Sequence, residues 1–208
     1  MTGRFIAFEG GEGTGKSTQV RMLADALAAK SIAVVSTREP GGTIGAEAIR
    51  ELLLSPPGDG WSMRSEALLF AAARADHVGN LIRPAIARGQ WVLCDRFVDS
   101  SRAYQGAAGD LGYDSIDALH EFGSDGLEPD LTIVLTVDDA ARRQRLLERD
   151  GGASDAIGGR DTAFHRKVAD AFVELTNRPS YVQIDGGRPV EDVHRDVVAA
   201  IEERFGLS

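Results

Sequence analysis

Short apolar runs alternate with segments of helical periodicity along most of the chain. The apolar runs predict buried strands at residues 4–8, 32–36, 91–95, 131–137 and 181–184. Apolar residues that recur every three or four positions predict helices at residues 16–29, 45–54, 65–88 (broken or ended near Pro84), 139–149, 162–176 and 190–205. Strands that alternate with helices are typical of βαβ units, and strands that are apolar on both sides belong in a parallel sheet covered by helices on both faces.

This pattern predicts a three-layer α/β/α fold around a five-stranded parallel sheet. No internal repeat, low-complexity tract or linker divides the chain, so we expect one domain over residues 1–208. Residues 150–159 contain four glycines and no strong period, which indicates a mobile loop. We expect this loop to belong to a lid of about residues 145–165.

The composition narrows the kind of partner. The 208 residues include 23 Lys and Arg against 32 Asp and Glu, a net charge of −9, which argues against nucleic acid because phosphate backbones need a basic surface. A small phosphorylated ligand needs only a local basic pocket and is not excluded. Only three of the 23 cations are lysines. Genomic base composition explains this bias, so clustered arginines are weak evidence and a lysine at a motif position is stronger evidence.

The single cysteine, Cys94, rules out an internal disulfide and favours a reducing compartment. The longest purely apolar run, residues 67–73, is far shorter than the roughly 20 residues of a membrane span. We also recognise no signal peptide in the first residues. We therefore expect a cytoplasmic protein that has no membrane partner.

A phosphate-binding motif follows the first predicted strand and opens the first predicted helix. Residues 10–17 read GGEGTGKS and match G-x-x-x-x-G-K-[ST] at every fixed position, in the structural context that the motif requires. Backbone N–H groups and the helix N-terminus bind the α- and β-phosphates, the lysine reaches the β- and γ-phosphates, and the serine hydroxyl binds Mg²⁺. The motif predicts an ATP·Mg²⁺ site at Gly10, Gly11, Glu12, Gly13, Thr14, Gly15, Lys16, Ser17 and the adjoining Thr18.

The third predicted strand ends in Asp95-Arg96. An acid at the carboxyl end of a neighbouring strand lies where such folds bind Mg²⁺ or its water, so Asp95 is a metal candidate, although an ordinary aspartate at a strand end is the plainer alternative. Arg96 could bind a phosphate through its planar guanidinium. No [NT]-K-x-D segment is present, which argues against a GTPase, and a motor would need a longer chain. A small kinase with a phosphorylated acceptor fits best.

Three further segments carry a family resemblance. They read TREPGGT at residues 37–43, LLFAAAR at 68–74 and DRFVDSSRAYQG at 95–106. Together with the P-loop, they resemble the thymidylate kinase family of bacteria over nearly the whole chain. The resemblance implies a P-loop fold, transfer of phosphate from ATP·Mg²⁺ to dTMP, and a homodimer.

The resemblance also implies roles in reading the base. It assigns Phe70 to stacking on thymine, Arg74 to hydrogen bonding with the base, and Ser101 and Gln105 to the base edge. A flat aromatic ring with a few polar groups is how proteins read a base. Without the family, Phe70 would be interpreted as a core residue and Arg74 as part of a solvated helix face.

Four residues are assigned to the sugar and the acceptor phosphate. The resemblance places Arg38 and Arg96 on the phosphate of dTMP, and it places Glu9 and Tyr104 along the deoxyribose. Two arginines suit a dianionic phosphate, and Tyr104 would occupy the space of a 2′-hydroxyl. A core or interface role for Tyr104 is the alternative.

The predicted lid is rich in arginine. Position 13 is Gly where one branch of the family has an arginine in the P-loop, so the resemblance assigns the catalytic arginines to the lid. Arg149 and Arg160, which flank the lid glycines, are the candidates, and Arg145 matches the position that packs on adenine. A solvated helix face is the alternative for each. The sequence departs from the family at Phe97, where a tyrosine is usual.

Two other functions stay open. A related nucleoside or nucleoside-monophosphate kinase would need only different contacts at Phe70, Arg74 and Gln105. A non-catalytic nucleotide-binding regulator could share the fold, but the retained Lys16 and Asp95 argue against it.

Overall fold

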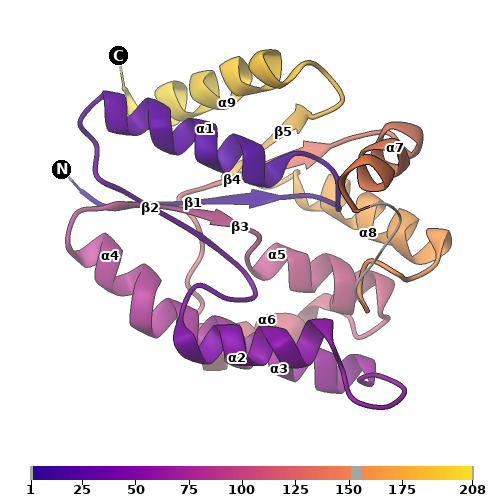
Figure 1. The fold of residues 1–208 in the computed structure, drawn as a ribbon. Coiled ribbons are helices and arrows are strands. Elements are labelled where there is room, and N and C mark those ends of the chain that lie inside the picture. Colours follow the sequence, from indigo (N-terminus) through magenta and orange to yellow (C-terminus); the bar gives the residue numbers. More distant parts are fainter. Residues whose placement is uncertain (1, 151–155, 208) are drawn as a thin grey trace.

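A parallel sheet runs through the middle of the computed structural model, which describes residues 2–150 and 156–207, with the side chains of residues 149 and 150 left out (Figure 1). Its five strands lie in the order β2-β3-β1-β4-β5. Their bounds are β1 Arg4–Glu9, β2 Val34–Arg38, β3 Trp91–Asp95, β4 Leu131–Thr136 and β5 Tyr181–Asp185. The three-layer α/β/α fold and the parallel sheet predicted from the sequence are confirmed.

Helices cover both faces of the sheet. In Figure 1, α1 and α9 lie on one face, and α2 to α6 lie on the other. The helices and helical turns are α1 Lys16–Ala29, α2 Ile44–Leu54, α3 Met63–His77, η1 Val78–Ile82, α4 Arg83–Ala87, α5 Val98–Ser101, η2 Arg102–Ala108, α6 Tyr113–Ser124, α7 Asp139–Asp150, α8 Thr162–Leu175 and α9 Val190–Phe205. None of the helices in the described parts of the chain has the length and apolar character needed to cross a membrane.

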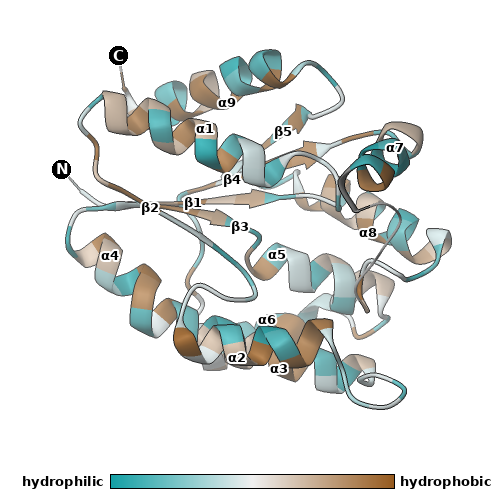
Figure 2. Ribbon diagram, viewed as in Figure 1, coloured by the Kyte–Doolittle hydropathy of each residue, from teal (hydrophilic) through white to brown (hydrophobic). Residues whose placement is uncertain are grey.

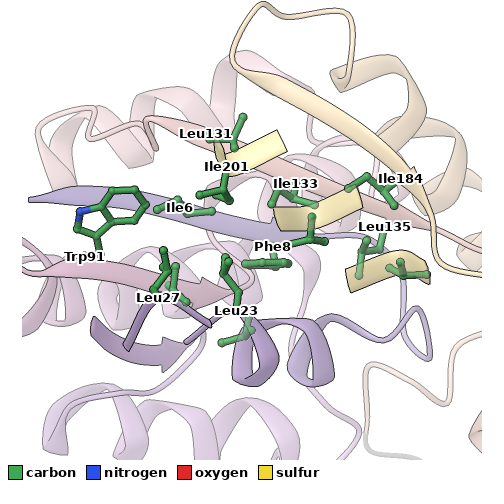
Figure 3. Packing of buried hydrophobic residues seen from close by; sticks show 14 of the residues in the cluster. Ile6, Phe8, Leu23, Leu27, Trp91, Leu131, Ile133, Leu135, Ile184 and Ile201 are labelled. Atoms are coloured by element: carbon green, nitrogen blue, oxygen red, sulfur yellow. The ribbon is translucent and has the colours of Figure 1, made fainter. Parts of the chain in front are cut away.

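The central strand β1 is buried on both faces because its successive side chains point to opposite sides. Ile6 and Phe8 pack with Leu23 of α1 and Ile201 of α9 on one face (Figure 3). Phe5 and Ala7 point the other way and pack against residues of α3, η1, α4 and α6. Hydrophobic and hydrophilic residues alternate around the covering helices (Figure 2), as expected for helices with one face on a core. Two hydrophobic layers therefore hold the sheet rigid beneath its loops.

The carboxyl ends of the strands meet at one edge of the sheet, where ligands bind in open α/β folds. Pairing sets Arg38 of β2 beside Asp95 of β3, and Asp95 beside Phe8 of β1. The P-loop follows β1, and the segment from Arg96 to α5 follows β3. Parallel pairing thus brings three distant parts of the chain to one place.

The helical segment around Pro84 and the helices after Phe97 differ from the sequence expectations. The predicted helix at 65–88 is α3, a π-helical turn and α4, with Pro84 near the start of α4, where its missing N–H costs little. Residues 98–124 were not predicted as helical, yet they form α5, η2 and α6. The buried residues of α6 are Ile116, His120 and Ser124, so its inward face carries little apolar signal.

Candidate active site

The P-loop turns sharply between β1 and α1. Gly10 has φ of 131°, and a Cβ there would lie 2.2 Å from the carbonyl oxygen of Leu135, so only glycine fits. The Nζ of Lys16 donates to the carbonyl oxygens of Gly10 at 3.1 Å and of Gly11 at 2.7 Å. Burial and the positive charge of Arg96 lower the pKa of Lys16 from 10.5 to about 7. This ammonium is therefore held where an added negative charge would stabilise it.

A cavity of about 560 Å³ opens beside the P-loop, within the size range of small-molecule sites. It brings together most of the predicted site residues. Those that line it are Glu12, Gly13, Gly15, Lys16, Ser17, Thr18, Arg38, Phe70, Asp95, Arg96, Ser101, Tyr104, Gln105 and Arg145. Six predicted residues are not part of its lining: Glu9, Gly10, Gly11, Thr14, Arg74 and Arg160. The side chain of Arg149 lies outside the described residues.

Ser17 and Asp95 meet at the edge of this cavity. The Ser17 hydroxyl donates to Asp95 Oδ2, which joins the start of α1 to the end of β3. Hydroxyl and carboxylate oxygens suit Mg²⁺, which takes only one or two protein ligands besides water and phosphate oxygens. Within residues 2–150 and 156–207, no group of three or more His, Cys, Asp and Glu side chains is arranged to hold a metal ion. The pair fits an ion that is shared with a phosphorylated ligand.

Arg96 connects the P-loop to the opposite wall of the cavity. Its Nη1 donates to the carbonyl oxygen of Gly10 and to Ser100 Oγ, both at 3.1 Å, and its Nη2 lies 3.4 Å from the hydroxyl of Tyr104. The guanidinium carbon lies 5.2 Å from the Tyr104 ring centroid. Burial opposes its charge, but Tyr104 and Asp95 keep the pKa of Arg96 above its ordinary value. A permanent cation thus lies between the two walls.

The backbone of Arg96 is unusual for a residue with a side chain. Its φ is 71°, in the left-handed region that non-glycine residues rarely adopt. The Arg96 N–H donates to the carbonyl oxygen of Phe8 at 2.8 Å, which holds this conformation. Such local strain clusters at functional sites.

Glu9 lies beneath the cavity. Its Oε1 accepts from the backbone N–H groups of Phe97 at 2.7 Å and Ser100 at 3.0 Å, and its Oε2 accepts from Ser100 Oγ at 2.7 Å. Complete burial, with the charge of Asp99, raises the pKa of Glu9 from 4.5 to about 8. Glu9 therefore supports the start of α5, and Glu12 is the P-loop carboxylate that lines the cavity.

Phe70 lines the end of the cavity predicted to hold the base, and Arg74 lies behind that wall. Arg74 is 2% exposed; its Nε donates to Glu39 Oε2 and its Nη2 to Ser101 Oγ, both at 2.8 Å. Its guanidinium carbon lies 5.5 Å from the ring of Phe97, which is packed in an apolar pocket. In this structure the guanidinium of Arg74 is therefore bonded to Glu39 and Ser101 and does not line the cavity where the base is predicted to bind.

Two other predicted arginines that line the cavity, Arg38 and Arg145, come from different elements. Arg38 ends β2, and its Nη2 lies 3.0 Å from both carboxylate oxygens of Glu47. Arg145 of α7 donates to the carbonyl oxygens of Gly13 at 3.3 Å and Gly186 at 2.9 Å, beside the P-loop. Arg145 thus lies beside the P-loop, and its contact with adenine stays a prediction.

Several residues of the site were not predicted. Glu66 is 5% exposed and hydrogen-bonds Gln105 and Arg160; its position four residues before Phe70, on the same helix face, was the available signal. Glu66 is not part of the cavity lining; the lining residues that were missed are Glu39, Pro40, Arg50, Leu54, Ser100, Leu146 and Ile157. Glu39 and Pro40 belong to the TREPGGT segment and Ser100 belongs to DRFVDSSRAYQG, whereas Arg50, Leu54, Leu146 and Ile157 carry no local signal.

These features define a P-loop NTPase fold whose cavity extends past the P-loop to a second, aromatic wall. The family model for thymidylate kinase matches residues 8–197, and the chain belongs to this family, as the sequence resemblance predicted. It is 59% identical to the thymidylate kinase of Rhizorhabdus wittichii over 174 residues (83% of each chain) and 48% identical to that of Bradyrhizobium sp. strain ORS 278 over 206 residues (98% of this chain, 91% of the relative). A crystal structure of thymidylate kinase from Ehrlichia chaffeensis matches 97% of this chain and 100% of its own with a TM-score of 0.79 and 31% identity.

The raised pKa of Glu9 predicts a pH dependence of stability. Because the folded state holds the proton between pH 4.5 and about 8 and the unfolded state does not, this contribution to the free energy of unfolding is lost as pH rises through that window. Glu9→Gln keeps the acceptor and removes the titration. We would measure the free energy of unfolding with denaturant at pH 5, 7 and 9. From pH 5 to pH 9, the free energy of unfolding of Glu9→Gln should rise relative to that of wild type by at least about 1.4 kcal/mol, the equivalent of one pKa unit.

The matched control is Glu203→Gln on the exposed side of α9. Its difference from wild type should stay constant with pH. Parallel pH curves for wild type and Glu9→Gln would show that Glu9 is not protonated in the folded protein.

Proposed function

We propose that this chain transfers the γ-phosphoryl group of ATP to the phosphate of dTMP, giving ADP and dTDP. The observation that carries the proposal is a single cavity lined by Lys16 and Ser17 on one side and by Phe70 and Gln105 on the other, with Arg96 between them. Membership of the thymidylate kinase family supports the same reaction.

ATP would bind on the P-loop side. Lys16 and the backbone N–H groups of the loop would bind its phosphates, and Arg145 would lie against the adenine. Ser17 and Asp95 would hold Mg²⁺, which neutralises charge on the phosphates when bound. The hydrogen bond between Ser17 and Asp95 supports this assignment because it brings a hydroxyl oxygen and a carboxylate oxygen together at the P-loop.

dTMP would bind on the aromatic side. Phe70 would stack on the base, while Arg38 and Arg96 would hold the acceptor phosphate. The ring of Tyr104 is buried, with Phe172 edge-on to it and Phe164 at a tilt. Tyr104 would leave no room for a 2′-hydroxyl on the sugar. The resemblance assigned Glu9 to the deoxyribose; because Glu12 lines the cavity and Glu9 does not, we propose Glu12 as the carboxylate that would contact the sugar.

Transfer needs little covalent chemistry from the protein. The acceptor phosphate is already a nucleophilic anion, so an in-line transfer requires positioning and charge stabilisation. Arg96 supplies a fixed positive charge between the two phosphates. Arg149 and Arg160 of the lid remain proposed catalytic groups, and closure of the lid would exclude water from the reaction. The predicted cytoplasmic location, and the prediction that nucleic acid is not a partner, are retained.

A homodimer is proposed through the face formed by α2, α3 and α6. These helices pack on one another, and exposed apolar side chains stand on each of them: Ile44, Leu52, Leu68 and Phe122. Phe122 is 89% exposed and Ile44 95% exposed, which is costly for a free surface. Figure 2 shows hydrophobic residues along this group of helices.

The reaction is tested by measuring ADP formation from ATP and Mg²⁺ with dTMP, dUMP, UMP, CMP, AMP and GMP. We expect dTMP to give the highest kcat/KM. Lys16→Ala should lower kcat at least about 100-fold, the scale of removing one hydrogen-bond donor that stabilises a transition state. Preference for a monophosphate with another base would support a kinase but contradict the assignment of Phe70, Arg74 and Gln105 to thymine. If none of the acceptors increases ADP formation, the result would favour the non-catalytic nucleotide-binding regulator.

The dimer is tested with Leu68→Glu/Phe122→Glu, which places two charges on the proposed interface. Light scattering should give twice the mass of the chain for wild type and the monomer mass for the variant. Val173→Glu, on the exposed side of α8, is the control and should keep the wild-type mass. A variant that keeps the dimer mass would exclude this face.

A further inference from the structure

A buried carboxylate joins the base end of the cavity to the lid. Glu66 of α3 is 5% exposed, and its Oε1 accepts a hydrogen bond from Gln105 Nε2 at 2.7 Å. Its Oε2 accepts a hydrogen bond from Arg160, which lies in the predicted lid of about residues 145–165. Both oxygens of this carboxylate are therefore engaged, one by each side of the site.

The bond to Glu66 determines which end of the Gln105 amide is free. A glutamine amide has a donor end and an acceptor end, whereas an ionised carboxylate only accepts, so Nε2 must face Glu66. Gln105 is 1% exposed and, like Phe70, lines the cavity. Among the described residues its Oε1 has no hydrogen-bond partner. The free end of the amide is thus an acceptor.

An acceptor at this place distinguishes pyrimidines. Thymine and uracil carry N3–H, a donor, on the edge where cytosine has a bare N3, an acceptor, and proteins read unpaired bases on this edge. We propose that Glu66 is a positioning residue that fixes the amide of Gln105 with its carbonyl oxygen toward the base, and so selects thymine over cytosine. The inference rests on the proposed function, because it takes the base to lie beside Phe70 and Gln105.

Arg160 explains why a carboxylate occupies this position. Its guanidinium pairs with Glu66 and lies 4.6 Å from the ring centroid of Phe164, whose ring is 6.1 Å from that of Tyr104. Arginine only donates, so the group at position 66 must offer it an oxygen. Only a carboxylate can offer oxygens to Arg160 and to Gln105 at once. The lid arginine thereby helps to lock the orientation of Gln105.

The decisive variant is Glu66→Gln. Its carbonyl oxygen must face Arg160, so its NH₂ group faces Gln105, which must turn its own oxygen inward and present Nε2 to the base. A donor then opposes N3–H of thymine and matches N3 of cytosine. In competition between dTMP and dCMP in one tube, the dTMP:dCMP ratio of kcat/KM should fall at least about tenfold from wild type, the scale of one mispaired polar group. The ratio does not depend on the amount of folded enzyme. Any effect of Arg74 on the ratio is the same in wild type and in the variants, because Arg74 is present in all of them.

A reciprocal swap separates orientation from loss of charge. In Glu66→Gln/Gln105→Glu, the carboxylate at position 105 accepts from the amide at position 66 and turns its other oxygen to the base, so the ratio should return to at least a third of the wild-type value. Glu203→Gln, on the exposed side of α9, should leave the ratio unchanged.

A ratio within threefold of wild type in Glu66→Gln would overturn the proposal, even if kcat falls, because Glu66 would then act on the lid alone. If Glu66→Gln does not fold, the swap decides: a ratio below a third of wild type overturns the proposal and a higher one supports it. Failure of the proposed function is a separate result, since wild type itself would then show no preference for dTMP.

Discussion

The guanidinium of Arg96 is the contact on which the rest of the site depends. It hydrogen-bonds the carbonyl oxygen of Gly10 in the P-loop and Ser100 Oγ at the start of the second wall, and it lies against Tyr104. Its backbone, at φ 71°, is held by a bond to β1. One residue thus fixes the distance between the loop that would bind the donor and the wall that would bind the acceptor. Phosphoryl transfer depends above all on such positioning.

Buried polar and charged side chains are satisfied by specific partners throughout the site. Glu9 accepts from two backbone N–H groups and a hydroxyl, Arg74 pairs with Glu39, and Glu66 is shared between Gln105 and Arg160. An unpaired charge at these depths would be very costly, whereas a satisfied network fixes one arrangement of side chains. Polar groups that are already oriented need not reorganise during a reaction, which is the basis of electrostatic catalysis. The rigid core beneath β1 keeps these partners in register.

Features set by local sequence could be predicted, and contacts between distant residues could not. The strands and the P-loop follow from apolar runs and glycine spacing within a few residues. The helix at 113–124 was missed because its buried face includes His120 and Ser124. Glu9 and Glu12 are three residues apart, and only the fold decides which one lines the cavity. Glu66 was missed because its partners are 39 and 94 residues away.

The most direct measurement is a crystal structure of the protein with ADP, Mg²⁺ and dTMP bound. The account predicts both nucleotides in one cavity, with the phosphate of dTMP on the guanidinium of Arg96 and the thymine ring stacked on Phe70. It also predicts that Ser17 and Asp95 lie closest to the metal ion. A dTMP phosphate bound away from Arg96, or a base bound away from Phe70, would contradict the account.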